Sequence, residues 1–205
     1  MKSTWRALFF LSLLLGFQSS QALSLIDDFS DDLPTVYSPA SGSTTLLNPF
    51  FSNSRDWSLS HLGRMGSFLI YDGMLALNSN ADTQAILTLS YANGAGFDFT
   101  PFGNAFFLDV DNVESNGVTL TLTVDGSQHS RTINAPGHVT FLFEDLSGAD
   151  MTNVHNVSLE IYSGYQVDSG YRSFGVKVPE PLPLALLALG ALVAAGRRGA
   201  GLTGR

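Results

Sequence analysis

The densest group of charged side chains lies near the N-terminus. Four carboxylates fall within six residues: Asp27, Asp28, Asp31 and Asp32. Such groups repel one another unless water or a cation neutralises them, and Ca²⁺ prefers oxygen ligands of this kind. The spacing differs from that of an EF-hand loop. Two interpretations therefore stay open, a calcium site or a solvated acidic segment.

Tyrosines in glycine-rich, loop-like sequence are the second candidate for a functional site. Tyr162 and Tyr165 flank a Ser-Gly pair, and Tyr171 follows Gly170. An aromatic ring with a polar edge suits a surface that stacks against sugar rings. A loop tyrosine is also a common surface residue with no ligand. We therefore hold these three as candidate ligand-binding residues, with ordinary surface positions as the alternative.

Residues for catalysis form no recognised motif. The four histidines have no metal-ligand spacing, no nucleophile elbow of the Gly-x-Ser-x-Gly type is present, and the chain has no cysteine. Carboxylate pairs for glycoside hydrolysis are matched in space, so the sequence leaves that possibility open. Enzymes of that type usually have longer chains. We expect a protein that is not an enzyme and has no cofactor other than a possible calcium ion.

The charge balance restricts the partners. Between Leu23 and Pro181 there are five basic residues against all 18 acids, a net charge of 5 − 18 = −13. A surface of this charge repels phosphate backbones, so nucleic acid is not an expected partner.

The elements that would position these residues are short strands. Val118 to Val124 alternates β-branched polar with aliphatic residues at period two, which is typical of a half-buried strand. Asp-Gly pairs at 72–73 and 125–126 predict tight hairpins. About nine or ten such strands, one helical turn within 145–153 and no amphipathic helix predict an all-β fold. We expect an antiparallel β-sandwich over residues 23–177, jelly-roll-like or immunoglobulin-like.

Both ends of the chain carry targeting features. Residues 1–22 combine a basic start, an apolar run of eleven residues and small residues before Leu23, which predicts a secretory signal peptide. Near the other end, Val178-Pro179-Glu180-Pro181 precedes fifteen uncharged residues at 182–196, and Arg197-Arg198 follow them. A helix of fifteen residues covers about 22 Å, less than the roughly 30 Å of a hydrocarbon core, so it predicts a marginal transmembrane anchor.

The C-terminal segment, 178–205, resembles the PEP-CTERM sorting signal of Gram-negative bacteria. The motif Val178-Pro179-Glu180-Pro181, the apolar segment and the pair Arg197-Arg198 occur in the order of that family. The resemblance implies recognition by an exosortase, after signal peptidase has acted at the N-terminus. It further implies transient anchoring in the inner membrane, then release to the cell surface or the exopolysaccharide matrix. It implies no activity for the body of the protein.

The body resembles jelly-roll carbohydrate-binding modules in outline. That resemblance implies a structural calcium where the first strand meets the last ones, which points to Asp27, Asp28, Glu160 and Asp168. Two functions remain in view. The first is a non-enzymatic structural or adhesive component of an extracellular, biofilm-type matrix. The second is a carbohydrate-binding module that uses Tyr162, Tyr165 and Tyr171.

Overall fold

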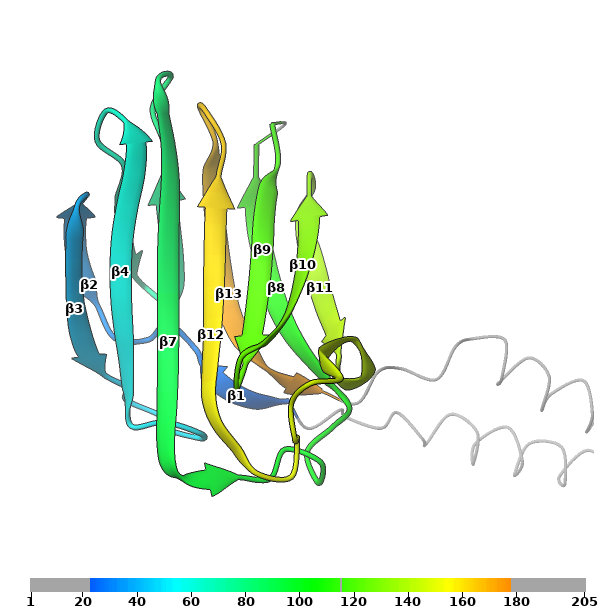
Figure 1. The fold of residues 1–205 in the computed structure, drawn as a ribbon. Coiled ribbons are helices and arrows are strands. Elements are labelled where there is room, and N and C mark those ends of the chain that lie inside the picture. Colours follow the sequence, from blue (N-terminus) through cyan, green and yellow to red (C-terminus); the bar gives the residue numbers. More distant parts are fainter. Residues whose placement is uncertain (1–22, 115, 178–205) are drawn as a thin grey trace, which may run out of the picture.

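The fold is a sandwich of two antiparallel β-sheets, seen in a computed structural model that describes residues 23–114 and 116–177 (Figure 1). A single 3-10 turn in this part of the chain, η1, covers Phe143–Leu146. The strands are β1 (Ser24–Asp27), β2 (Leu33–Tyr37), β3 (Ala40–Thr45), β4 (Ser54–Gly63), β5 (Ser67–Tyr71), β6 (Met74–Asn78), β7 (Thr83–Phe97), β8 (Ala105–Val113), β9 (Val118–Val124), β10 (Ser127–Ile133), β11 (Gly137–Leu142), β12 (Val154–Ser163) and β13 (Asp168–Lys177).

The two sheets have different strand orders, and we call them sheet A and sheet B. Sheet A has the order β11-β8-β13-β6-β5-β2, and β1 pairs with the second half of β13. Sheet B has the order β10-β9-β12-β7-β4-β3 and faces the viewer in Figure 1. Every pairing is antiparallel, which confirms the predicted all-β antiparallel sandwich.

The core forms because successive side chains of a strand point to opposite faces. In β9 the aliphatic residues are buried and the threonines between them are partly exposed, so this strand has one apolar and one polar face. Strands β7 and β12 follow the same rule over most of their length. The inward faces of both sheets meet in one continuous hydrophobic cluster.

The described domain closes on itself where its first and last strands pair. Ser24 lies opposite Val176, so both ends of the domain lie together at one end of the sandwich (Figure 1). Gly175 makes this pairing possible, because a Cβ there would collide with the Ser24 carbonyl oxygen and the Leu25 Cα. The loops that follow β4, β6, β8 and β12 lie at the opposite end.

Three local predictions differ from the structure. The three prolines and weak periodicity of segment 30–54 predict a long connection with one weak strand near 44–47, but the segment contains both β2 and β3. The glycine-rich sequence at 93–96 predicts a turn, but this stretch continues β7. The helical turn expected within 145–153 is η1, which starts at Phe143 and ends at Leu146.

The two targeting segments lie outside the described residues. These are the predicted signal peptide (1–22) and the whole predicted sorting signal (178–205), including Pro179, Glu180, Pro181 and the transmembrane segment 182–196. Within residues 23–114 and 116–177, no helix has the length and apolar character needed to cross a membrane.

Candidate functional site

The outer face of sheet B is covered by uncharged hydroxyl side chains, and we call it the hydroxyl face. Its residues alternate with buried core residues such as Leu59, Leu87 and Leu159, so they point away from sheet A. The hydroxyl side chains of this face include Ser41, Ser43, Thr45, Ser54, Ser58, Ser60, Thr88, Ser90, Thr119, Thr121, Thr123, Ser130, Thr132 and Ser158.

The strand register arranges these side chains in rows across the sheet. One row runs in the order Ser41, Ser58, Thr88, Glu160, Thr121 and Ser130. The next row runs in the order Ser43, Asp56, Ser90, Ser158, Thr123 and Gln128. Neighbouring side chains in a row stand about 5 Å apart, the spacing between strands. The face thus offers a regular lattice of hydrogen-bonding groups.

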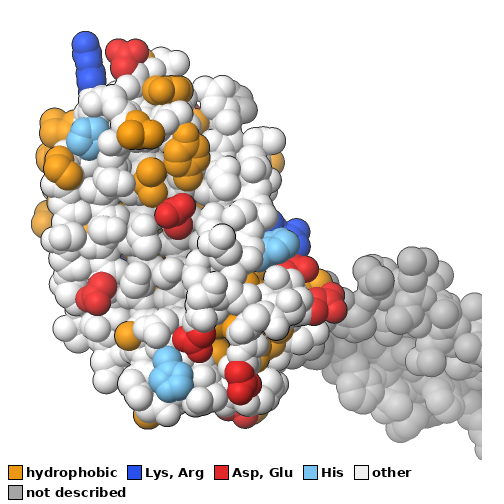
Figure 2. Space-filling model, in the orientation of Figure 1, with side chains coloured by type: hydrophobic (Ala, Val, Ile, Leu, Met, Phe, Trp, Pro, Cys, Tyr) orange, Lys and Arg blue, Asp and Glu red, His pale blue; other side chains and the backbone are white. Residues whose placement is uncertain are grey.

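A pair of partly apolar side chains interrupts the hydroxyl face near the end of β12. Tyr162 lies in a row between Ile86 of β7 and Thr119 of β9, and its side chain is half-buried. Cross-strand neighbours of this kind contact each other, so Ile86 supports the tyrosine ring. Figure 2 shows the face as mostly white, with scattered acidic side chains and hydrophobic side chains gathered over the upper part of β7 and β12.

A hollow of about 300 Å³ lies on the same face at the other end of these strands. Its polar lining includes Asp56, Ser90, Asn156 and Ser158. The β9–β10 turn is fixed beside it, because the Asp125 carboxylate accepts hydrogen bonds from two backbone N–H groups of β12 at 2.8–3.2 Å. The volume is at the lower limit for a small-molecule site, which suits one unit of a larger ligand.

The structure separates the three candidate tyrosines. Tyr162 stands on the hydroxyl face two residues from Glu160, and Tyr165 is 49% exposed in the β12–β13 loop. Tyr171 was expected in an exposed loop, and that prediction is wrong, because it is 0% exposed in the core. Its neighbour Gly170 also lies in strand β13, where it pairs with Asn112 of β8.

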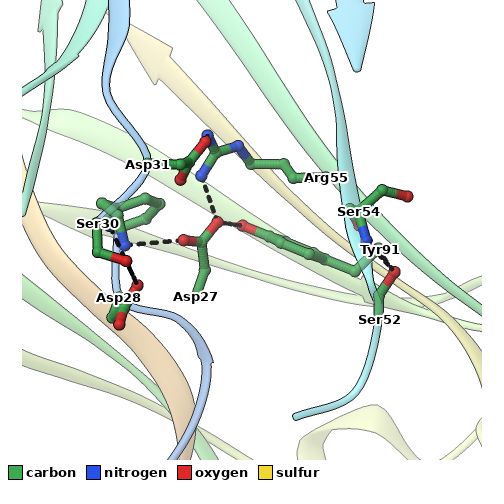
Figure 3. A network of polar contacts seen from close by, with 9 residues as sticks. Asp27, Asp28, Ser30, Asp31, Ser52, Ser54, Arg55 and Tyr91 are labelled. Atoms are coloured by element: carbon green, nitrogen blue, oxygen red, sulfur yellow. Dashed lines mark hydrogen bonds and ion pairs between the residues drawn. The ribbon is translucent and has the colours of Figure 1, made fainter. Parts of the chain in front are cut away.

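Two of the four carboxylates of the acidic cluster, Asp27 and Asp31, belong to a buried network (Figure 3). Arg55 of β4 donates from Nη1 to Asp27 and from Nη2 to Asp31, both at 2.6 Å. The Tyr91 hydroxyl donates to the same Asp27 oxygen at 2.7 Å. The side chains of Arg55 and Asp27 are fully buried. This network joins the segment after β1 to both β4 and β7, so it is a structural link between the two sheets.

Burial and charge act against each other within this network. Burial raises the pKa of Asp31 more than the Arg55 guanidinium lowers it, and the Asp27 charge raises it further. Burial and the Asp27 carboxylate hold the pKa of the Tyr91 hydroxyl well above its usual value, so the phenol stays protonated. Asp28 lies outside the network. Its partial burial is outweighed by hydrogen bonds from Ser30 and Asn48, which lower its pKa.

The four carboxylates named as possible calcium ligands do not converge. Asp27 lies opposite Phe174, six residues along β13 from Asp168, a separation of about 20 Å at the usual strand rise. Glu160 is on the outer face of the other sheet. Asp168 lies by Glu114, and burial and that neighbouring charge raise its pKa. No group of three histidines, aspartates or glutamates in the described residues is placed to hold a metal ion.

Sequence reasoning missed two features of these sites. Arg55, Trp57 and Leu59 occupy alternate positions of β4, so their side chains point to the same face. This alternation alone places Arg55 on the buried side of the strand. The same rule places Tyr162 and Glu160 outward, because Leu159 and Ile161 are core residues. The hydroxyl face as a whole required the strand order of sheet B, which no local pattern supplies.

Comparisons with known proteins give distant structural likeness alone. The sequence matches no protein-family profile and no curated protein at a significant level. A family 11 carbohydrate-binding module from Clostridium thermocellum, solved with a mixed-linked tetrasaccharide, is similar with a TM-score of 0.39 and 14% identity, over 78% of this chain and 98% of that one. A family 29 carbohydrate-binding module complexed with mannohexaose gives 0.38 and 15%, over 71% and 93%. An exo-beta-agarase gives 0.42 and 12%, where the chain spans 77% of its own length and 25% of the enzyme's. Likeness at this level assigns no role to any residue here.

Proposed function

We propose that this chain is an exported, non-enzymatic protein that binds polysaccharide through the hydroxyl face of sheet B. The observation that carries the proposal is the face itself, a regular array of hydroxyl groups with a supported tyrosine and two separate carboxylates. The function combines the two classes predicted from the sequence, because a matrix component acts by holding matrix polymer.

The chemistry of the face suits a sugar polymer. Serine and threonine hydroxyls both donate and accept hydrogen bonds, as sugar hydroxyls do, so the two can pair in many registers. The Tyr162 ring provides an apolar surface for the C–H groups of a sugar ring, and its hydroxyl remains a polar contact. The carboxylates of Asp56 and Glu160 accept from sugar hydroxyls and form the stronger, charge-assisted hydrogen bonds.

The charges of the protein favour a polymer without acidic groups. Asp56 and Glu160 are both exposed on the hydroxyl face, and the chain as a whole is acidic, with a formal net charge of −8. Like charges repel across an interface and suppress wrong partners. We therefore infer a neutral polysaccharide as ligand.

The placement of the carboxylates also supports binding without hydrolysis. Asp56 and Glu160 lie two strands and two residues apart, about 12 Å between Cα positions at usual sheet spacings. The paired carboxyl groups of glycosidases, about 5–9.5 Å apart, flank the scissile bond, whereas Asp56 and Glu160 project from one side of a single sheet. A single-sided hydroxyl array holds a chain without flanking one of its bonds from two sides.

The route to the ligand is part of the proposal. The predicted signal peptide and the resemblance of residues 178–205 to PEP-CTERM signals support export and exosortase processing. The inner membrane would hold the protein briefly, and release would place the sandwich at the cell surface or within the matrix.

Retention on immobilised polysaccharides tests the proposal. The full chain is passed over cellulose, mannan and agarose, and Tyr162→Ala and Glu160→Gln are compared with wild type. We expect retention on at least one neutral polymer, weakened about tenfold by Tyr162→Ala. Leu47→Ala, which removes a 67% exposed side chain from the β3–β4 loop, is the control and should change nothing. Equal retention of wild type and Tyr162→Ala would refute the assignment of this face.

A further inference from the structure

A second surface with sugar-binding chemistry lies on the other side of the sandwich. Tyr37 at the end of β2 and Tyr71 at the end of β5 are 58% and 66% exposed, among the most exposed large side chains of the described residues. Phe68 and Ile70 of β5 point into the core, so Leu69 and Tyr71 point outward from sheet A. Tyr37 pairs with Ser67, which shares the parity of Tyr71 and so lies on the same outer face.

A groove of about 440 Å³ runs beside Tyr71 between β2 and β5. Its lining is mainly apolar and includes Pro34, Leu69 and Tyr71, and Thr35 and Asp32 add polar groups. The Asp32 carboxylate accepts a hydrogen bond from the backbone N–H of Asp72 at 3.3 Å, which holds the segment before β2 against the β5–β6 turn. A mainly apolar lining with a few polar groups is the usual composition of a small-ligand site.

The charges near the groove favour a neutral sugar as ligand, as do those of the hydroxyl face. Two carboxylates lie beside Tyr71: Asp72 follows it directly in the β5–β6 turn, and Asp32 lines the same groove. Arg172 of β13 forms a 2.6 Å ion pair with Asp111 and does not belong to the lining of the groove. An acidic polymer would meet repulsion here, whereas a neutral sugar ring can stack on the tyrosine and donate hydroxyl hydrogen bonds to a carboxylate.

We propose that the Tyr37–Tyr71 surface is a second site for neutral polysaccharide, and that one molecule bridges two polymer chains. This inference rests on the proposed function of the hydroxyl face. The hydroxyl face is the outer side of sheet B and the Tyr37–Tyr71 surface is on the outer side of sheet A, so the two sites face in opposite directions. A polymer segment on one site therefore leaves the other site open to a different chain, and the protein acts as a cross-link.

The size of the second site fits a stretch of polymer rather than a single sugar. Tyr71 lies four residues along β5 from the position that pairs with Tyr37, and β2 is the adjacent strand. At usual strand dimensions the two tyrosines stand about 14 Å apart. Two exposed rings at this separation contact different units of one extended chain.

A two-layer capture assay tests the bridging. The full-length chain is bound to an immobilised neutral polysaccharide, cellulose, mannan or agarose, and fluorescein-labelled polymer of the same kind is then added in solution. Wild type should retain the label. The double variant Tyr37→Ala/Tyr71→Ala should still bind the first layer through the hydroxyl face and retain at least tenfold less label, with an unchanged melting temperature.

The outcomes separate the two proposals. Label retained equally by wild type and the double variant would overturn the second site and leave the hydroxyl face standing. A wild type that binds the first layer and retains no label would overturn it as well. First-layer binding lost in Tyr37→Ala/Tyr71→Ala and unaffected by Tyr162→Ala would instead refute the hydroxyl face and leave one site, on sheet A. No retention of wild type on any of the three polymers would refute both.

Discussion

Removal of the Arg55 guanidinium should destabilise the protein more than removal of any surface charge. Arg55→Met keeps much of the side-chain volume but deletes both 2.6 Å ion pairs, to Asp27 and to Asp31. Asp27 is then a fully buried carboxylate whose remaining side-chain donor is the Tyr91 hydroxyl. Because the carboxylates stay in place, the cost is that of uncompensated buried charge.

The expected loss of unfolding free energy is about 3–5 kcal/mol, the range measured when one partner of a buried ion pair is removed. A domain of this size has a total stability of about 5–15 kcal/mol, so a large share of it disappears. The melting temperature should fall by roughly 10 °C. Arg64→Met is the matched control, since Arg64 and Asp82 form a 4.0 Å pair with side chains 80% and 71% exposed. That change should cost under about 0.5 kcal/mol.

Equilibrium urea unfolding measures these differences, and their pH dependence gives a second test. Arg55 lowers the pKa of Asp31, so its removal raises that pKa further above the usual value of 3.8. A raised carboxyl pKa favours the folded state when the group is protonated, and this contribution is lost as the pH rises through the folded-state pKa. The deficit of Arg55→Met should therefore shrink in acid. A loss below about 1 kcal/mol at neutral pH, or a deficit that grows in acid, would refute the reasoning.

Three further changes have defined outcomes. The Tyr171 and Ser169 hydroxyls are buried, and neither forms a hydrogen bond of good geometry within the described residues. Burial raises the pKa of Tyr171, and the nearby Ser169 hydroxyl offsets part of that rise. Tyr171→Phe should then leave the urea midpoint unchanged or raise it, and a loss above about 1 kcal/mol would contradict this. Asp168 has a pKa raised by burial and by Glu114, so its ionised form opposes folding above that pKa. Asp168→Asn should raise the melting temperature slightly at neutral pH and have no effect below pH 3.8; a stabilisation seen in acid alone would show the sign to be wrong. Alanines at 179–181 should leave the full-length protein in the inner membrane, as followed by immunoblots of membrane and medium fractions, whereas normal release would disprove the sorting proposal.

The sequence predicted the sandwich because the alternation that defines it is local. In β9 each threonine and its aliphatic neighbours specify one polar and one apolar face without reference to the rest of the chain. Where alternation was weak, as in the polar edge strand β3, the strand was placed incorrectly. Edge strands pair on one side and need few apolar residues, so local patterns identify them poorly.

The site was harder to predict because glycine has two uses. The sequence around Gly170 and Tyr171 is typical of a loop, but Gly170 lies in strand β13 and pairs with Asn112 of β8. Glycine beside Tyr165 does belong to a connection between strands. The sequence does not distinguish a loop glycine from a strand glycine, because the difference depends on whether a distant strand pairs with the glycine's backbone.

The acidic cluster shows the same dependence on distant residues. From the sequence, calcium or water is the expected partner of Asp27 and Asp31. In the structure their main partner is Arg55, more than twenty positions away on the other sheet. Pairing of this kind is decided by topology. The alternation of side chains along β4 is the local signal that places Arg55 inward, and a buried arginine requires carboxylates as partners.

Binding of sugar on the hydroxyl face can be located by chemical-shift mapping of the backbone amides during titration with a soluble neutral oligosaccharide. The largest shifts should cluster on β4, β7, β12 and β9 around Thr88, Glu160 and Tyr162, and Tyr162→Ala should abolish them. Shifts confined to the loops between strands, or no shifts with any neutral glucan, mannan or agarose oligomer, would contradict binding on this face.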